Sequence, residues 1–515
     1  MIALSGKIAQ KYDEHSPVAK DLNKIVSALA QKDATLWGKA AESEARVRLN
    51  WIDLPKSSRL LLPELDALSA WARANDLTNF ILCGMGGSSL APEVMAKTFK
   101  RSLTILDTTD PSQISAALPL DLARTLVIVG SKSGSTIETA SQKSFFEEQF
   151  RSAGLDPIKH FLIVTDPGSP LDVDSRSAGY KVINADPDVG GRFSALSAFG
   201  LVPAALIGID VSVLLDDADL ASSTFSQPNS PAVQLATLLF EQCEQNFSLT
   251  DEKSNVSGLG DWIEQLVAES TGKDERGRLP IVIESSALKI SGPALQIGFA
   301  EGVAELNVTA SLGEHFILWE WVTALLCRAL HVDPFNQPNV TEAKERTSEL
   351  LANWRNTGPV DPQPTLVTQN FDVYANGSPS SLRQAITNLI DPTRKYLAVM
   401  AYLDRNNDSQ ISGMRNLLAS NLDIGVTFGW GPRFLHSTGQ FHKGGSQNGA
   451  FIQITGASSK DLEIPGREFS FHTLLMAQAL GDAAAISSRN FPLLRIHLKD
   501  RKIGISEILD QLKKL

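Results

Sequence analysis

A hydrophobic run that ends in a turn rich in hydroxyl groups, Thr125–Thr139, constrains the fold of this chain more than any other stretch. Leu126–Val129 is apolar and mostly β-branched, a composition typical of a strand buried on both faces of a parallel sheet. Gly130 ends this run, Ser131–Thr136 (SKSGST) follows, and Ile137–Phe150 has an amphipathic helical pattern. The sequence therefore predicts a strand, a turn and a helix, which is the repeating unit of an α/β sheet.

The turn gathers hydroxyl side chains and one lysine, Lys132, where the predicted helix begins. The first N–H groups of a helix lack intrahelical partners and carry partial positive charge. Together with the hydroxyls and the ammonium group they favour the binding of a phosphate. The alternative interpretation is a serine-rich helix cap that binds no ligand, and this loop alone is compatible with both.

Strands and helices alternate around this turn. Strands are predicted at Asn79–Cys83, Leu103–Leu106, Thr125–Val129, His160–Val164 and Tyr180–Ile183. This alternation indicates a doubly wound parallel sheet, in which ligands bind at the carboxyl ends of the strands.

The loop after the first of these strands, Gly84–Ser89, partly matches a dinucleotide-binding fingerprint. It lacks the third glycine of that motif. A glycine-rich turn with Ser88, next to a second serine-rich turn, suits a compact phosphate better than a pyrophosphate.

The α/β pattern continues in the second half of the chain. Helices are expected over residues 216–255, at Trp262–Ser270, at Pro293–Leu306 and from His315. Strands are expected at Leu279–Glu284, Tyr396–Tyr402, Ile424–Gly429, Ala450–Ile454 and Leu493–His497. We expect four parts: a helical segment (1–60), a first α/β domain (61–215), a second (216–358) and a C-terminal α/β region (359–515). Pro359–Thr365 is the predicted linker.

Composition excludes several classes of protein. The net charge of −11 and the isoelectric point near 5.3 argue against binding to nucleic acids or to membrane surfaces, which need basic patches. Three cysteines form neither a disulfide framework nor a metal-ligand spacing, so we expect buried free thiols in a reducing compartment. No signal peptide is evident, the apolar stretch Phe193–Ile209 is expected to be a buried helix, and we expect a cytoplasmic location.

Several polar residues outside the turn are candidates for chemistry. Arg192 follows Gly190–Gly191 and precedes the apolar stretch, although a solvated arginine in a surface turn is the usual meaning of such a pattern. Gln265 and Glu269 are four residues apart and share one face of a predicted helix. Glu269 is alternatively a helix-end carboxylate paired with Lys273. The Gly431–Gly445 segment is interpreted as a structural loop or an interface in preference to a substrate contact.

The order of the motifs resembles the phosphoglucose isomerase family. The motifs are GMGGSSL, SKSGSTIET, VGGRFSALS, QLVAESTGK, GEHF and DPFNQPNVTEAK, and they cover about residues 50–350. The C-terminal segment with GPRFLHSTGQFHKGG is similar to the isomerase half of transaldolase–isomerase fusions in some bacteria. The resemblance implies two doubly wound parallel-sheet sugar-isomerase (SIS-type) domains with an α/β C-terminal region.

The resemblance also implies roles for individual residues. It assigns phosphate or substrate binding to Ser88, Ser131, Lys132, Ser133, Thr136, Gln265 and Gln337, and catalysis to Glu269, Arg192, His315 and Lys344. In these roles Glu269 transfers the proton, Arg192 stabilises the enediolate, and the histidine and lysine open the sugar ring. The chain departs from many relatives at Ser133-Gly134-Ser135, where they have threonine-based sequences; the hydroxyl at Ser133 is kept.

The implied activity is the interconversion of glucose 6-phosphate and fructose 6-phosphate through a cis-enediolate, with no metal or organic cofactor. A homodimer is implied, because in this family the histidine can come from the neighbouring subunit. Two alternatives remain: a module that senses sugar phosphates without turning them over, and an isomerase that also accepts mannose 6-phosphate.

Overall fold

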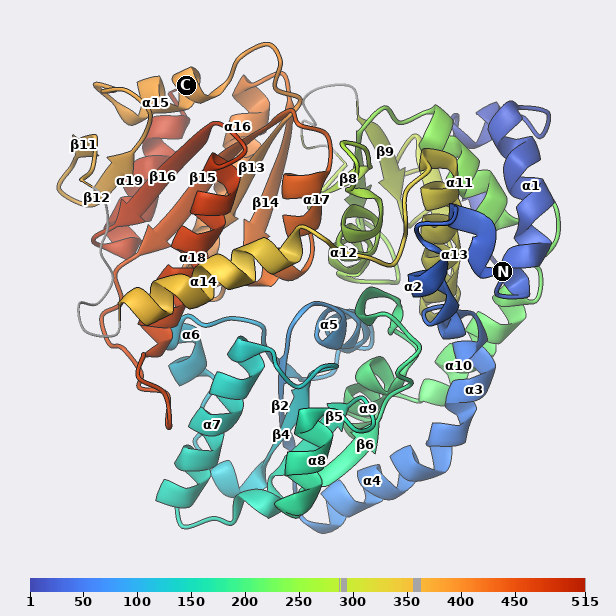
Figure 1. Cartoon of the computed structure of the whole chain (residues 1–515), viewed down its shortest axis with the longest axis horizontal. Helices are drawn as coiled ribbons and strands as arrows, with labels where there is room; N and C mark the ends of the chain where they lie inside the picture. The colour runs from blue at the N-terminus through green and yellow to red at the C-terminus, as the bar shows by residue number, and fades with distance from the viewer. Residues whose placement is uncertain (287, 289–293, 355–362, 515) are drawn as a thin grey trace. The chain divides into compact units, whose positions relative to one another are not determined.

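The computed structural model describes residues 1–286, 288, 294–354 and 363–514 (Figure 1). The chain divides into two compact units. The first comprises Met1–Asp107, Ala117–Ser286 and Leu295–Asn336, and the second takes in Thr108–Ala116 and Gln337–Leu515. Two sheets belong to the first unit and one to the second. The predicted α/β class, with mainly parallel sheets, is confirmed.

The first sheet is parallel throughout. Its strands are β2 (Asn79–Gly84), β3 (Thr104–Leu106), β4 (Thr125–Gly130), β5 (Phe161–Thr165) and β6 (Lys181–Asn184). They lie in the order β3-β2-β4-β5-β6, and all six residues of β4 are buried, as the hydrophobic run predicts. Because β3 and β4 flank β2 on opposite sides, the chain reverses its direction of winding between β2 and β4. The loops after these two strands therefore border the crevice where doubly wound sheets bind ligands.

Helices cover this sheet. α7 (Ile137–Ser152) contacts β2 and β4, α8 (Pro170–Ser177) contacts β5 and β6, and α5 (Leu90–Thr98) packs on α9 (Ala198–Leu206), which in turn contacts β5 (Figure 1). α9 lies within Phe193–Ile209, and its residues are almost all buried, so the prediction of a buried helix is confirmed. In the part of the chain that the structure describes, no helix is long and apolar enough to cross a membrane.

The second sheet has five strands, of which four are parallel. They are β1 (Ala3–Ser5), β7 (Asn246–Thr250), β8 (Leu279–Val282), β9 (Leu295–Gly298) and β10 (Leu306–Thr309). The order is β1-β10-β9-β7-β8, with β1 antiparallel at the edge. The order β8-β7-β9-β10 repeats the order β3-β2-β4-β5 of the first sheet, so both sheets wind in the same way.

Two predictions about this region are wrong, and a third holds except at the start of the chain. Residues 216–255 are not helical throughout, because Asn246–Thr250 forms the central strand β7, with all five side chains buried although three of them are polar. The predicted helix Pro293–Leu306 is replaced by β9 and β10 in its described part; Gly302 between them adopts a left-handed conformation (φ +72°) that interrupts a helix. Residues 1–60 are mainly helical, but Ala3–Ser5 forms an edge strand.

Two helices of this sheet carry candidate residues. α12 (Leu259–Thr271) follows β7 and packs on β8. α13 (Leu312–Leu330) begins with a capping box between Ser311 and Glu314 and is almost wholly buried. It contacts α12 and three further helices: α1 (Pro17–Ala30), α10 (Val211–Ser222) and α11 (Pro231–Glu241). α13 is therefore the centre of the helical layer in this unit.

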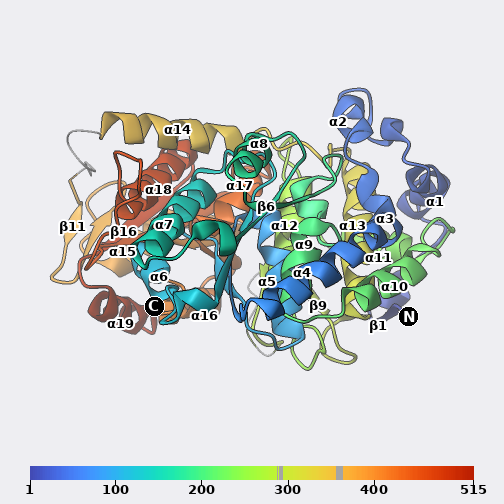
Figure 2. The same ribbon diagram turned by 90° about the horizontal axis from the view of Figure 1, so that it is seen from below.

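The second unit is built around a third sheet. Its strands are β11 (Leu366–Val367), β12 (Phe371–Tyr374), β13 (Tyr396–Ala401), β14 (Gly425–Trp430), β15 (Gly449–Gly456) and β16 (Leu493–Leu498), in the order β11-β12-β16-β15-β13-β14. Strands β13 to β16 are parallel and repeat the winding of the other two sheets. In Figure 2, α14 (Val340–Asn353) and α18 (Phe471–Ser487) lie on one side of β16 and α19 (Arg501–Leu512) on the other.

A short excursion from the first sheet also belongs to the second unit. After β3 the chain runs through Thr108–Ala116, which contains α6 (Pro111–Ala116). Asp110 forms an ion pair with Arg501 (2.8 Å), and the Thr109 hydroxyl donates a hydrogen bond to Gln478 (2.7 Å). The second unit therefore includes this segment, which lies between β3 and β4, as well as the chain from Gln337 onward.

Each unit has its own hydrophobic core. One core runs from Ile8 to Phe335 and is continuous across the first two sheets, and the other runs from Phe371 to Leu512. The expected four-part division, with boundaries after residues 60, 215 and 358, stays a prediction. The last of these boundaries, and residues 359–362 of the predicted linker Pro359–Thr365, lie outside the described residues.

Candidate active site

The serine-rich turn between β4 and α7 is held in shape by its own hydroxyl groups. The Ser131 hydroxyl donates to Thr136 Oγ1 (3.3 Å) and accepts a hydrogen bond from the Gly134 N–H (3.2 Å), while Ser133 and Ser135 bond each other. Thr136 occupies the N-cap position of α7, but its side chain makes no capping hydrogen bond. Because the Thr136 hydroxyl does not accept hydrogen bonds from the first N–H groups of α7, it leaves these groups to another acceptor. This favours the interpretation as a phosphate site over that as a helix cap without a ligand.

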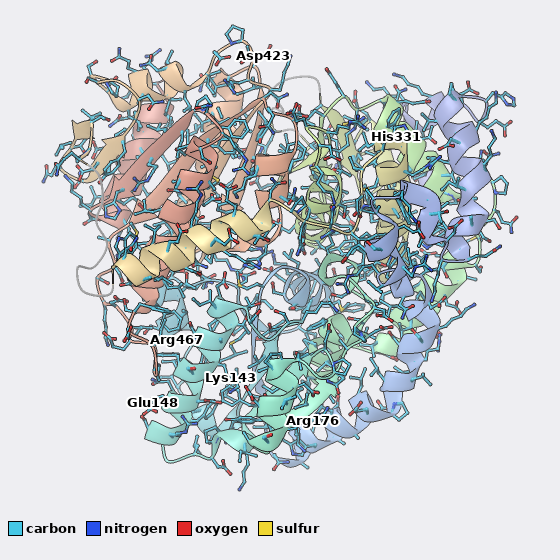
Figure 3. The ribbon with its side chains drawn as sticks, in the orientation of Figure 1. Lys143, Glu148, Arg176, His331, Asp423 and Arg467 are labelled. Carbon is cyan, nitrogen blue, oxygen red and sulfur yellow. The ribbon has the colours of Figure 1, made fainter. Side chains whose placement is uncertain are left out.

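Lys132 is engaged within the chain. Its ammonium forms an ion pair with Asp166 and donates a hydrogen bond to the carbonyl oxygen of Pro187 (2.9 Å). Burial raises the pKa of Asp166, and the neighbouring Lys132 opposes this shift. Lys132 therefore ties the turn to the residue that follows β5, and its role as a phosphate ligand stays a prediction. Figure 3 labels Lys143 on α7 and Arg176 on α8, the helices that follow β4 and β5.

The loop after β2 packs directly on the loop that carries Arg192. A Cβ atom at Gly87 would lie 1.9 Å from the carbonyl oxygen of Gly191, so only glycine fits there. The Ser194 hydroxyl donates to the same oxygen (2.6 Å). Ser88 lies close to the Ser131–Thr136 turn as well, since a Cβ at Gly130 would be 3.2 Å from Ser88 Cβ. These close approaches bring Ser88, the turn and the Arg192 loop together.

Arg192 lies outside α12 but is the centre of a buried polar cluster that it forms with side chains of α12. Its side chain is 5% exposed, which rules out the solvated surface arginine. Nε donates to the Ser270 hydroxyl (2.8 Å), and Nη1 lies 3.3 Å from Glu269 Oε1. Gln265 Nε2 donates to the other carboxylate oxygen of Glu269 (3.1 Å), so the predicted shared helix face is confirmed. Both oxygens of the Glu269 carboxylate are thereby oriented.

A turn formed by Asp333–Asn336 completes this cluster. The Asp333 carboxylate accepts the N–H of Phe335 (2.8 Å), and the Phe335 ring packs against Trp37 and Phe193. The turn directs the Pro334 carbonyl to Arg192 Nη2 (2.5 Å) and the Asn336 carbonyl to the same atom (3.2 Å). The sequence Asp-Pro-Phe-Asn, with an Asp that caps its own backbone, is a usable signal for this turn.

Lys273 belongs to this cluster as well, although the sequence suggested it only as an ion-pair partner for Glu269. It follows α12, is 3% exposed, and donates a hydrogen bond from Nζ to the Asn336 carbonyl (2.9 Å). Burial and the nearby Arg192 lower the pKa of Lys273 to about 7. It forms no ion pair with Glu269 among the described residues, so the alternative of a Glu269–Lys273 pair fails. The signal was present in the sequence as a Gly-Lys pair just after the Glu269 helix.

His315 lies in the first turn of α13 and is fully buried. Both ring nitrogens lack a hydrogen-bond partner in the described part of the chain, and the ring meets Phe299 edge-on at 5.3 Å. Burial lowers the pKa of His315 to about 3, so the imidazole is neutral at physiological pH. No described hydrogen bond joins it to Glu269 or Arg192. To act across a subunit boundary, the ring would have to leave this position.

Lys344 and Gln337 belong to the second unit. Lys344 is exposed on α14, and Gln337 is exposed just before that helix. The side chain of Gln440 binds this segment with two amide hydrogen bonds: Nε2 donates to Asn339 Oδ1 (2.8 Å), and Oε1 accepts the Asn339 N–H (3.0 Å). The Gly431–Gly445 segment therefore supports the start of the Lys344 helix, in line with the structural interpretation.

Two further contacts fix α14. Arg489 forms an ion pair with Glu342 (2.6 Å) and donates to the Lys443 carbonyl (3.2 Å). Gly481 of α18 lies so close to Thr347 that a Cβ there would be 3.0 Å from the threonine hydroxyl. The helix that carries Lys344 is thus a rigid part of the second unit.

The three cysteines, Cys83, Cys243 and Cys327, are free and buried, as predicted. Within residues 1–286, 288, 294–354 and 363–514, no three His, Cys, Asp or Glu side chains gather in a way that would hold a metal ion.

Known proteins share this site region. Residues 68–274 match the model of the phosphoglucose isomerase family. A glucose-6-phosphate isomerase from Thermus thermophilus is 34% identical over 249 residues, which cover 46% of this chain and 59% of the relative. A chloroplastic glucose-6-phosphate isomerase from Arabidopsis thaliana is 36% identical over 213 residues, covering 38% and 35%. The chain thus spans about six-tenths of the first relative's length and about a third of the second's.

Two solved structures share the fold. A hypothetical protein from Thermus thermophilus superposes with a TM-score of 0.57 at 25% identity, covering 68% of this chain and all of the other. A glucose-6-phosphate isomerase from Chlamydia trachomatis gives a TM-score of 0.54 at 18% identity, covering 69% and 89%. The family match confirms the resemblance to phosphoglucose isomerases over residues 68–274. The resemblance of the C-terminal segment to fused isomerases stays a prediction.

Proposed function

We propose that this protein is an aldose–ketose isomerase that interconverts glucose 6-phosphate and fructose 6-phosphate, a reaction of glycolysis and gluconeogenesis. The observation that carries the proposal is the buried Arg192–Glu269 pair at the carboxyl-terminal end of α12, with Gln265 on the second carboxylate oxygen. A carboxylate held beside a guanidinium is suited to moving a proton between neighbouring carbons. The similarity to named glucose-6-phosphate isomerases supports the same reaction.

The proposed chemistry follows from the charges. Glu269 removes a proton from C2 of the opened aldose and returns it to C1. Negative charge then develops on the two oxygens of the cis-enediolate, and the positive Arg192 guanidinium stabilises it. Gln265 fixes the carboxylate, so little reorganisation is needed when the proton moves.

The sugar must be held while its carbons react. We assign the phosphate to the Ser131–Thr136 turn and the first N–H groups of α7, with Ser88 beside them. Gln337 is assigned to substrate contact. Ring opening needs an acid and a base, and the family resemblance assigns these roles to His315 and Lys344. Because that resemblance includes a histidine supplied by the neighbouring subunit, we also propose a homodimer, and a cytoplasmic location.

A coupled assay tests the proposal. Purified protein is incubated with fructose 6-phosphate, and glucose 6-phosphate is detected through its dehydrogenase. Turnover supports the isomerase. Binding of glucose 6-phosphate by calorimetry without turnover would replace it with a sugar-phosphate sensor. Mannose 6-phosphate in the same panel decides whether the enzyme acts on both epimers.

A further inference from the structure

A second buried cation, Lys273, lies beside Arg192 and has no part in the proton transfer proposed for Glu269. Lys273 Nζ and Arg192 Nη2 both donate hydrogen bonds to one acceptor, the carbonyl oxygen of Asn336, at 2.9 and 3.2 Å. Two positive groups, of which Arg192 is 5% and Lys273 3% exposed, converge on this oxygen, so their repulsion is weakly screened. Such an arrangement is costly unless negative charge is close, and the nearest carboxylate on α12 is Glu269.

We infer that Lys273 is a positioning residue of the Glu269 site: it fixes the Asn336 carbonyl and with it the Arg192 guanidinium, and it adds a second positive charge opposite the reacting oxygens. The inference rests on the proposed isomerase function. It extends that function, because the rate of isomerisation then depends on whether the Lys273 amine is protonated. The segment Asp333–Asn336 is the connection through which Lys273 acts on Arg192.

The surroundings of Lys273 define when that charge is present. Arg192 disfavours the ammonium, while Glu269 and Asp333 favour it. Cys327 of α13 also faces it, and burial raises the pKa of that thiol to about 12, so it is neutral near pH 7. With the pKa of Lys273 lowered to about 7, the group is charged in mildly acidic solution and neutral in alkaline solution. An anionic sugar phosphate favours the ammonium and moves this transition to higher pH.

The test is the pH dependence of isomerisation in three forms of the full chain: wild type, Lys273→Met and Lys273→Arg. For wild type we expect kcat/KM to fall about ten- to a hundredfold as the pH passes through about 7, because a charged hydrogen bond is lost. The transition in kcat should lie at higher pH. Lys273→Met should have low activity without this fall, and Lys273→Arg should stay active at pH 9. Lys24→Met, an exposed lysine of α1, is the matched control.

A second measurement does not depend on activity. In protein labelled with ¹³C at the lysine ε-carbons, one signal should titrate near pH 7 and be missing from Lys273→Met. A Lys273 signal that stays charged up to pH 10, or an unchanged alkaline fall in Lys273→Met, overturns the inference. If wild type shows no turnover at any pH, the proposed function fails, and the NMR titration still decides the state of Lys273.

Discussion

Arg192 Nη1 lies 3.3 Å from Glu269 Oε1, and both side chains are at most 8% exposed. The two charged groups therefore pair with each other inside the fold. Removing one member of a buried ion pair leaves the other charge unpaired, which costs more than the pair itself contributes. Substitutions here consequently change both stability and catalysis, and the two effects have to be separated.

Glu269→Gln separates them best, because it keeps the shape of the side chain. We expect isomerisation to fall by a factor on the order of 10³ or more, since the proton-transferring carboxylate is gone. Binding of glucitol 6-phosphate, an open-chain analogue that cannot isomerise, should change only a few-fold by calorimetry. Glu244→Gln, at an exposed position, is the control. Activity retained in Glu269→Gln would remove this residue from the base role.

Arg192→Ala should lower kcat about 10²- to 10³-fold, because the enediolate loses its fixed positive charge. It should also destabilise the protein by roughly 3–5 kcal/mol, since Glu269 stays buried without its partner. Adding Glu269→Gln to Arg192→Ala should restore part of this stability, as measured by urea unfolding. A double variant less stable than Arg192→Ala would contradict the ion pair as the cause.

Substitutions in the phosphate turn should affect binding. In Ser131→Ala and Thr136→Ala we expect KM for the sugar phosphate to rise roughly tenfold with kcat changed only a few-fold, because the phosphate does not take part in the reaction at C1 and C2. Steady-state kinetics of each variant measures this. A fall in kcat at constant KM would argue against the cradle.

Gly134 tests the shape of the same turn. It has φ +71°, and a Cβ there would lie 2.5 Å from Leu171 Cβ. Gly154 has φ +72° with open space around it, so Gly154→Ala introduces the backbone strain without a steric clash. Gly134→Ala should destabilise the protein by about 1–3 kcal/mol more than this control in thermal or urea unfolding. Equal effects would mean that the turn shifts freely.

The two hydrogen bonds between Gln440 and Asn339 should support the position of Lys344 for catalysis. If Lys344 takes part in ring opening, Gln440→Ala should lower kcat roughly three- to tenfold by loosening the start of α14. The effect should disappear when Lys344 is already alanine, which a double-mutant cycle measures. Gln384→Ala, in the same unit, serves as the control. Additive effects would show that Gln440 acts elsewhere.

Two buried histidines should make stability depend on pH. Burial lowers the pKa of His315 and of His442 to about 3, so the folded state keeps them neutral, while the unfolded chain binds protons below about pH 6.5. Stability from these groups is therefore complete above pH 6.5 and is lost as the pH falls toward 3. Each should cost about 2 kcal/mol at pH 5.

Urea unfolding at pH 7.5 and pH 5 measures this loss. His442→Gln should reduce the difference between the two pH values, whatever its effect at pH 7.5. An unchanged difference would mean that His442 is protonated in the folded state.

Local sequence patterns were sufficient where a strand is apolar throughout. Leu126–Val129 predicted β4, and the order of strands and turns predicted the doubly wound sheet and the position of the Ser131–Thr136 turn. The pattern was insufficient for β7, because Asn246, Ser248 and Thr250 are polar and their burial depends on neighbours that are remote in sequence.

The same distinction holds for the site. Gln265 and Glu269 are one helical turn apart, so their shared face followed from spacing. The link from Arg192 and Lys273 to the Asn336 carbonyl joins three segments far apart in the chain, which no local pattern describes. Likewise, nothing near His315 in sequence indicated that its ring would be enclosed.

The second unit includes Thr108–Ala116, early in the chain, as well as the chain from Gln337 onward. A gene rearrangement with a single breakpoint near residue 336 would therefore transfer only part of that unit. It would leave Asp110 without Arg501 and Thr109 without Gln478. We expect the two units to be inherited together, and any exchange of the C-terminal unit between homologous genes to require a matching replacement of these nine residues.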